Sequence, residues 1–207
     1  MFAGWPEEAL EFFEGLEADN SKSYWQAHKA TYEEAVLAPM QALLADLHPG
    51  WGDGRIMRPY RDIRFSKDKS PYKTFIAAMV GPGYVSLNSR TFGCGSGIWE
   101  VGPEMLERYR AAVDAPASGE ALVSVVAGLR SGGLDITAHE ALKSAPKGYA
   151  KDHPRIEFLR MKGIAAWQEW PVGAWLGTPE PAARVAGFLR AAAPLTGWLR
   201  EHVGTHE

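Results

Sequence analysis

The sequence of 207 residues contains 46% hydrophobic and 23% charged residues, a composition that excludes extensive disorder. Its single cysteine, Cys94, excludes an intramolecular disulfide, and no apolar run approaches the roughly 20 residues that a membrane helix requires. The formal net charge of −3 argues against a protein that coats nucleic acid non-specifically.

The same features set expectations about the protein's environment. We expect Cys94 to be a small buried hydrophobic residue, because nothing in the composition indicates an oxidising compartment. The start, MFAGWPEEALEFF, lacks the basic stretch and the cleavage pattern of a signal peptide. We therefore expect a cytoplasmic protein with no membrane partner.

Helices are predicted for the N-terminal quarter of the chain. Pro6 and the two glutamates after it suit a first helical turn. Asn20 or Ser21 is predicted to cap a second helix, which Pro39 kinks or splits. The sequence HPGWGDG, residues 48–54, is predicted to end this helix as a loop.

Short strands joined by tight turns are predicted for residues 75–101. This stretch contains β-branched and aromatic residues with glycines at short intervals, and residues 84–88 alternate between polar and apolar side chains. Pro103 then opens another predicted helix.

A further helix is predicted to be capped by Ser118 or Gly119 and to end at the pair Gly132 and Gly133. After it we expect a polar loop, a short helix near residue 159, a strand over 164–168, and a C-terminal helix bent near Pro194. Helices thus flank adjacent strands without βαβ alternation. This order predicts an α+β fold with a largely antiparallel sheet flanked by N-terminal and C-terminal helices, in a single domain over 1–207.

Two motifs, one rich in glycine and one that begins with histidine, lack residues or flanking structure that the corresponding enzyme sites require. GCGSGIW, residues 93–99, has strand-like flanks on both sides, so it does not suit a dinucleotide-binding loop, and Cys94 stands where a nucleophile elbow needs glycine. We interpret its glycines as sites of close backbone approach. HEALK has Lys143 where a zinc helix needs its second histidine, and the six histidines are scattered. We therefore expect no metal site and no cofactor.

The most unusual stretch is RPYRDIRFSKDKSPYK, residues 58–73, which we call the basic segment. The slightly longer stretch 55–73 carries a net charge of +5, so the remainder of the chain carries −8. A basic stretch on an acidic body favours local recognition of an anion. Arginine forks match phosphate or carboxylate groups, and lysines add point charge.

Pro59 favours an extended backbone, and RPYRDIRF is predicted to be an edge strand that leads into a loop. On a strand, Arg61 would share its face with Ile63 and Phe65. A charge on an apolar face needs a partner, because an unmatched buried arginine costs several kcal/mol. The alternatives are Asp62, a distant carboxylate such as Asp152, or an oxyanion from a ligand.

The spacing in the basic segment, together with three other segments, resembles a widespread, mainly bacterial family called domain of unknown function 2461. NSKSYWQAHKATYEEAVLAP resembles its N-terminal helical segment, GSGIW its glycine-tryptophan segment, and PKGYAKDHPRIEFLRMK a later segment. One departure is that similar chains tend to read asparagine-asparagine-x-glutamate-tryptophan near the N-terminus, whereas residues 20–25 read NSKSYW. The family name carries no assigned function.

The resemblance indicates which residues form a candidate site. In the basic segment and in KGYAKDHP, residues 147–154, the family patterns fall on Arg58, Arg61, Asp62, Arg64, Asp68, Lys69, Tyr72, Lys147, Tyr149, Asp152 and His153.

Our leading hypothesis is that these two segments meet and bind a phosphate or carboxylate group of a small metabolite, nucleotide or nucleic-acid end. The arginines and Lys69 would hold the anion, Asp62 would orient an arginine, and Tyr72 and Tyr149 would wall the site. His153 is the candidate proton carrier, and Asp62 a weaker one. If the protein is an enzyme, phosphoryl or phosphodiester chemistry fits this site best.

The alternative is a structural or protein-interaction domain. In that case the basic segment is an internal salt-bridge network or a solvated edge. The partner surface would then come from exposed tryptophans in AAWQEWPVGAW, namely Trp167, Trp170 and Trp175. Asp62, Asp68 and Asp152 each lie beside Arg or Lys, which lowers carboxylate pKa values and leaves poor general acids.

Overall fold

The computed structural model describes residues 1–64 and 67–204. Phe65, which the strand hypothesis places beside Arg61, and His206, one of the six histidines, lie outside the described residues. The chain divides into two compact units, each built from two separate stretches. The first comprises Met1–Cys94 and Glu169–Gly187, and the second comprises Gly95–Gln168 and Phe188–Glu207. A single domain over the whole chain stays a prediction.

The described elements follow one another in blocks of helices and strands. In chain order they are α1 (Glu8–Ala18), α2 (Lys22–Ala27), α3 (Lys29–Thr31), the π-helix η1 (Tyr32–Leu37), α4 (Ala38–Trp51), β1 (Gly54–Ile56), β2 (Phe75–Val80), β3 (Gly83–Asn88), β4 (Thr91–Ile98), α5 (Pro103–Asp114), α6 (Pro116–Ser131), β5 (Asp135–Thr137), α7 (Ile156–Arg160), β6 (Ile164–Pro171), the 3-10 helix η2 (Ala174–Gly177) and α8 (Glu180–His202).

The strands of the described residues form a six-stranded sheet in the order β1-β2-β3-β4-β6-β5. The pairs β1-β2, β2-β3 and β5-β6 are antiparallel. Helices stand before, between and after the strands in the chain. The predicted α+β class, with a largely antiparallel sheet and helices at both ends, is therefore confirmed.

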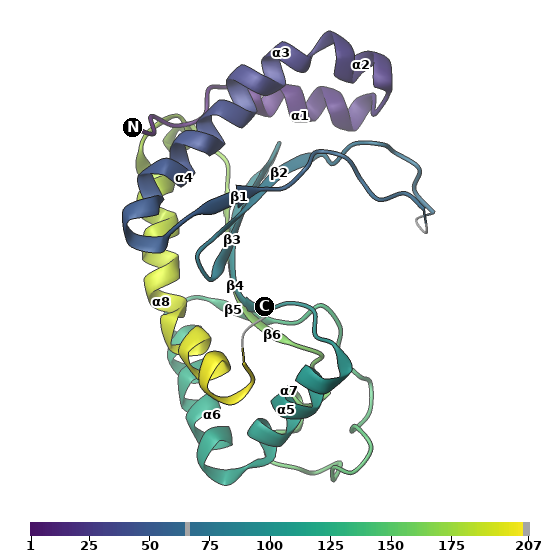
Figure 1. Cartoon of the computed structure of the whole chain (residues 1–207), viewed down its shortest axis with the longest axis vertical. Helices are drawn as coiled ribbons and strands as arrows, with labels where there is room; N and C mark the ends of the chain where they lie inside the picture. Colours follow the sequence, from purple (N-terminus) through teal and green to yellow (C-terminus); the bar gives the residue numbers. More distant parts are fainter. Residues whose placement is uncertain (65–66, 205–207) are drawn as a thin grey trace. The chain divides into compact units, whose positions relative to one another are not determined.

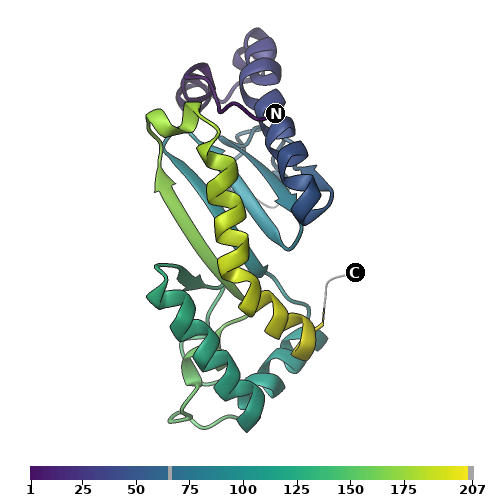
Figure 2. The ribbon, with the colours of Figure 1, turned by 90° about the vertical axis from the view of Figure 1, so that its left-hand side faces the viewer.

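In the first unit, helices α1 to α4 lie on one side of strands β1 to β3 (Figure 1). Helix α4 packs against β1 and β2 (Figure 2). The predicted cap of the second helix is confirmed, because the Ser21 hydroxyl accepts a hydrogen bond from the backbone N–H of Tyr24 at 3.1 Å. The buried face of α1 has helical spacing and consists of Ala9, Phe12, Phe13 and Leu16.

The predicted break at Pro39 takes a specific form. Pro39 lies in the first turn of α4, and the six residues before this helix, Tyr32–Leu37, wind as a π-helix. Proline has no N–H to donate to the carbonyl four residues earlier, so a widened turn relieves the mismatch. The predicted loop over 48–54 is wrong for its first four residues, because α4 continues to Trp51 with Pro49 inside it.

The predicted hairpins are confirmed. β2 pairs with β3 from Phe75↔Asn88 to Val80↔Gly83, which leaves a two-residue turn. Along β3 buried and half-buried residues alternate, with Val85 and Leu87 fully buried. This is the period of two that the polar and apolar alternation predicts.

In the second unit, α6 begins at Pro116, so the predicted cap at Ser118 or Gly119 is wrong. Proline suits the first helical position because its missing N–H would have no partner there. Ser118 instead donates its hydroxyl to the carbonyl of Ala112 at 2.6 Å. The predicted end at Gly132 is correct.

The glycine motif lies inside strand β4, as its strand-like flanks predict. Gly97 has a φ of 138°, and a Cβ atom built there would lie 2.4 Å from the carbonyl oxygen of Ile164. Gly95 faces the ring of Trp167, whose nearest atom would be 2.8 Å from a Cβ. These glycines therefore allow residues of β6 to approach β4 closely. Cys94 is fully buried, as expected, and burial raises the pKa of its thiol.

Among the described residues, no single helix is long and apolar enough to cross a bilayer. Only α5 and α6, taken together across a 90° bend, reach that length and composition.

We predict that Gly97→Ala destabilises the protein by about 2 kcal/mol or more, because the added methyl group clashes with backbone in a strained conformation. The measurement is the free energy of unfolding in urea. Gly197→Ala is the matched control, since this glycine lies in α8 with no atom within 4 Å of the added carbon. It should be neutral or stabilising by about 0.5 to 1 kcal/mol. Equal effects of the two substitutions would contradict the close-approach assignment.

Candidate functional site

The basic segment joins β1 to β2 as a long excursion (Figure 1). The predicted edge strand is wrong for Arg58–Arg64, which form no strand ladder. A single antiparallel bridge links Tyr60 to Tyr72. It is bounded by hydrogen bonds from the N–H of Arg61 to the carbonyl of Pro71 at 2.9 Å and from Lys73 to Pro59 at 2.8 Å. Tyr60 and Tyr72 therefore lie opposite each other without hydrogen bonds between their own backbone groups. In such a pair the two side chains lie close together on one face.

The expected alternation of faces nevertheless holds over the described residues. The exposed residues are Arg58, Tyr60, Asp62 and Arg64, and the half-buried ones between them are Pro59, Arg61 and Ile63. An extended backbone produces this period of two even without a ladder.

Arg61 has a partner within the protein. Its Nη1 forms an ion pair and hydrogen bond with Asp68 Oδ2. The candidates proposed from the sequence were Asp62, Asp152 or a ligand oxyanion, and the first two are wrong. Asp62 instead accepts three hydrogen bonds from Arg64, at 3.2 Å from the backbone N–H, 3.0 Å from Nε and 2.7 Å from Nη2. The loop reverses direction between Arg61 and Asp68, which brings residues seven positions apart into contact.

Further bonds tie the loop to itself. The Lys69 ammonium donates to the carbonyl of Ile63 at 2.9 Å, and the N–H of Ser70 donates to Asp68 at 2.9 Å. The hydrogen bonds from Ser70, with a smaller contribution from Arg61, lower the pKa of Asp68 to about 2. Hydrogen bonds from Arg64 lower the pKa of Asp62. Both carboxylates are thus held ionised.

The two aspartates leave most of the positive charge unneutralised. Four cations of the basic segment have no carboxylate partner among the described residues, namely Arg58, Lys67, Lys69 and Lys73. Arg58 is exposed and forms no hydrogen bond or ion pair with any described residue. Lys73 lies with its ammonium 5.8 Å from the centre of the Phe75 ring.

An aromatic cluster supports the segment. The rings of Trp25 and Tyr72 stack with centroids 4.3 Å apart and planes 5° from parallel. The ring of Tyr60 lies 5.4 Å from that of Tyr72 and 6.2 Å from that of Trp25. Trp25 and Tyr72 are buried, whereas Tyr60 is 51% exposed. Trp25 and Tyr60 were absent from the predicted site, although both are aromatic residues within or near its motifs.

Asn20 fixes the position of Tyr72. Its side-chain oxygen accepts from the N–H of Tyr72 at 3.0 Å, and its side-chain nitrogen donates to the carbonyl of the same residue at 3.1 Å. One amide group thus satisfies both backbone groups of a residue 52 positions away. The sequence offered Asn20 only as a helix cap, but Ser21 has that role.

The KGYAKDHP part of the predicted site belongs to the second unit. Lys147 and Asp152 are exposed and contact no described residue through a hydrogen bond or ion pair. Burial, and then the nearby charge of Asp114, raise the pKa of Tyr149. The basic segment belongs to the first unit, so the meeting of the two parts stays a prediction.

Both ring nitrogens of His153 are engaged. Nδ1 accepts from the N–H of Arg155 at 3.0 Å, so the ring proton lies on Nε2, which donates to Asp114 at 3.1 Å. Arg155 is buried and donates to the carbonyls of Val113 and Asp114, each at 2.7 Å. These are last-turn carbonyls of α5, which lack partners within the helix. Arg155 therefore caps the end of α5, and His153 bonds to the backbone N–H of Arg155 and to the Asp114 carboxylate.

The tryptophans that the alternative offers as a partner surface are half-buried. The Arg184 guanidinium of α8 lies 5.3 Å from the Trp170 ring centre and 4.0 Å from that of Trp175. The exposed tryptophan is Trp99, at 49%.

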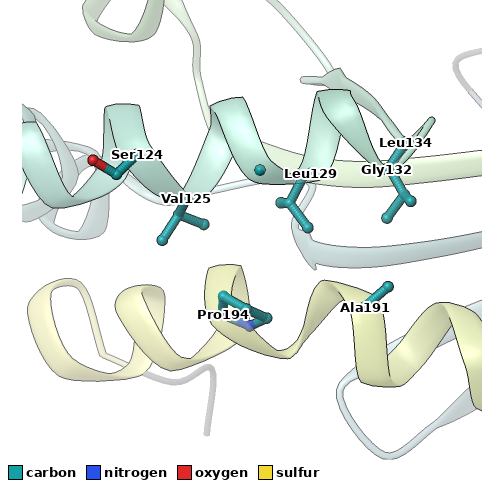
Figure 3. A pocket seen from close by; sticks show the side chains of 8 residues that line it. Ser124, Val125, Leu129, Gly132, Leu134, Ala191 and Pro194 are labelled. Carbon is teal, nitrogen blue, oxygen red and sulfur yellow. The ribbon is translucent and has the colours of Figure 1, made fainter.

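The second unit also has an apolar groove of about 490 Å³ between α6 and α8. Figure 3 shows Val125 and Leu129 pointing toward Ala191 and Pro194 on the facing helix. No residue of the predicted site lines it. Within the described part of the chain, no three His, Cys, Asp or Glu side chains lie together in a way that could hold a metal ion.

The fold and the basic segment define an α+β protein whose most distinctive feature is a positively charged loop on an aromatic support. The chain belongs to the family described as conserved hypothetical protein (DUF2461), whose model matches residues 8–198. This match confirms the suspected family. No curated protein matches the chain.

Among solved structures, the chain is similar to an uncharacterized protein from Methanothermobacter thermautotrophicus. The two share 12% identity and superpose with a TM-score of 0.42, over 80% of this chain and 96% of the other.

We predict that Asn20→Ala destabilises the protein by about 1 to 3 kcal/mol, because both backbone groups of Tyr72 lose their partner in a partly buried site. Hydrogen exchange should locate the effect, with faster exchange of the Tyr72 amide than of the amides in β3. Gln26→Ala is the control, because this exposed amide on α2 bonds to no described residue. If Asn20→Ala leaves hydrogen exchange at the Tyr72 amide unchanged, the prediction that Asn20 fixes Tyr72 is contradicted.

A second prediction concerns acid. The pKa of Asp68 in the folded protein is about 2, below its ordinary value of 3.8. Ionised Asp68 therefore stabilises the folded protein fully at pH values above 3.8. That effect disappears as pH falls through about 2. Asp68→Asn should therefore be less stable than the wild type at neutral pH, and the difference should shrink in acid. Urea midpoints measured across this range test it. Asp152→Asn should match the wild type throughout, and a pH-independent difference for Asp68→Asn would refute the prediction.

Proposed function

We propose that the basic segment binds an anionic ligand through a phosphate or carboxylate group. The observation that carries the proposal is the set of cations without carboxylate partners. Arg58 and Lys73 stand at the base of the loop, where the bridge between Tyr60 and Tyr72 holds the two arms together. Neither cation forms an ion pair with a described carboxylate, although the charge of Arg58 contributes to the lowered pKa of Asp62. Cations without ion pairs at the base of one loop suit an oxyanion.

The electrostatics of Lys73 supports this proposal. Burial lowers the pKa of Lys73, and the positive charge of Arg58 lowers it further. The second cause is repulsion between two like charges. An anion between them would reverse that repulsion and would favour the charged lysine.

The alternative of an internal salt-bridge network explains part of the segment. It accounts for the pairs Arg61 with Asp68 and Arg64 with Asp62. It leaves Arg58 without an ion pair among the described residues, although the charge of Arg58 contributes to the lowered pKa of Asp62. We infer that the pairs shape the loop and that the remaining cations contact the ligand.

Binding is a better proposal than catalysis at this site. A general acid must hold a proton near neutral pH, and hydrogen bonds lower the pKa values of both Asp62 and Asp68. His153, the other proton carrier considered, uses both ring nitrogens in hydrogen bonds.

The test is the thermal midpoint of the pure protein in inorganic phosphate or sulfate, with chloride at equal ionic strength as the reference. At ten times the dissociation constant, an anion adds about 1.4 kcal/mol of stability, or roughly 3 to 5 °C for a chain of this size. Arg58→Ala and Lys73→Ala should fold and lose the shift.

Arg55→Ala is the matched control, since Arg55 is an exposed β1 arginine whose side chain forms no hydrogen bond or ion pair with the described residues. It should keep the shift. A wild type that responds equally to chloride and phosphate, or a control that loses the shift as fully as Arg58→Ala, would overturn the proposal.

A further inference from the structure

Tyr60 has an unusual environment for an aromatic side chain. Among the described residues, only Tyr60 and Trp99 are aromatic residues classed as exposed, at 51% and 49%. The ring of Tyr60 is held from one side by Tyr72 and Trp25, which are themselves buried. A ring supported in this way keeps its orientation and leaves its other side open to solvent.

Charge lies next to this ring. Arg58 is two residues before Tyr60 in an extended stretch, and both are exposed on the same face. Asp62 and Arg64 continue that face with an ion pair that is neutral overall. An exposed ring next to a free guanidinium can contact a planar group and an adjacent anion at the same time.

We infer that Tyr60 is a stacking platform for a base of a single-stranded nucleic acid whose phosphates the basic segment binds. This inference rests on the proposed function and specifies its ligand class. Every base has a π-face, and proteins that bind single strands combine such rings with cations that follow the backbone.

The charge distribution favours a single strand over a duplex or a lone anion. In a duplex the base faces are stacked and inaccessible to a side chain. The acidic remainder of the chain, at −8, opposes the broad phosphate contact that duplex binding uses. Cations without a described carboxylate partner occur on both arms of the loop, at Arg58 and at Lys69 and Lys73, which suits more than one phosphate.

The experiment measures binding of fluorescein-labelled 12-mers of single-stranded DNA, single-stranded RNA and duplex DNA, with inorganic polyphosphate as the ligand without bases. We expect both single strands to bind more tightly than the duplex, and Tyr60→Ala to weaken single-strand binding about tenfold. Tyr60→Phe should retain it. The DNA and RNA arms show which sugar the site prefers.

Salt titrations separate the roles of ring and charge. The logarithm of the affinity falls with the logarithm of salt concentration, by about 0.7 for each phosphate contacted on a single strand. Arg58→Ala should reduce that slope by about 0.7, whereas Tyr60→Leu should lower affinity and leave the slope unchanged. Trp99→Ala, which removes the other exposed aromatic ring, should change neither.

The outcomes distinguish the two proposals. If polyphosphate binds and Arg58→Ala weakens it, but Tyr60→Ala and Tyr60→Leu bind single strands like the wild type, the stacking inference fails and the proposed function stands. If neither polyphosphate nor any strand binds, both fail. Equal binding of duplex and single strands also overturns the inference. Thermal midpoints of the variants confirm that each remains folded.

Discussion

The contact on which the basic segment depends is the junction of Asn20, Trp25 and Tyr72. The segment has a single bridge in place of a strand ladder, so its backbone contributes few bonds of its own. The amide of Asn20 holds both backbone groups of Tyr72, and the indole of Trp25 stacks on the tyrosine ring. Polar and apolar contacts from the N-terminal helices thus converge on one residue of the loop.

That junction also determines what the charges of the loop can do. Like charges in a flexible loop would move apart, but the bridge beside Tyr72 keeps Lys73 near Arg58. The Arg61 and Asp68 pair closes the loop farther out. The positive charges of the loop are thus held in place by neutral and ion-paired contacts, and the proposed anion would need little further ordering of the loop.

Local patterns in the sequence predicted much of the fold, and contacts between distant residues explain most of the errors. The alternation in residues 84–88 and the glycines of β4 predicted their strands, because period and close approach are local properties. In the basic segment, a period of two also predicted which of residues 58–64 are exposed. It did not predict that these residues form no strand ladder. The clamp from Asn20 spans 52 positions, and no spacing rule detects it.

Local sequence patterns could not identify the partner of Arg61. The sequence correctly indicated that a charge between Pro59 and Ile63 needs a partner, because its face is half-buried. It could not choose between carboxylates, since the choice of Asp68 depends on how the loop reverses.

The residues that resemble the family patterns differ in what the structure needs from them. His153 supports Arg155, which caps the end of α5, and Asp68 closes a loop, so the fold explains both. Arg58 is different, because it forms no hydrogen bond or ion pair with the described residues. Tyr60, which is outside the family patterns, exposes half of its side chain. The proposals above therefore rest on these two residues, because the contacts of the fold explain them less completely than they explain His153 and Asp68.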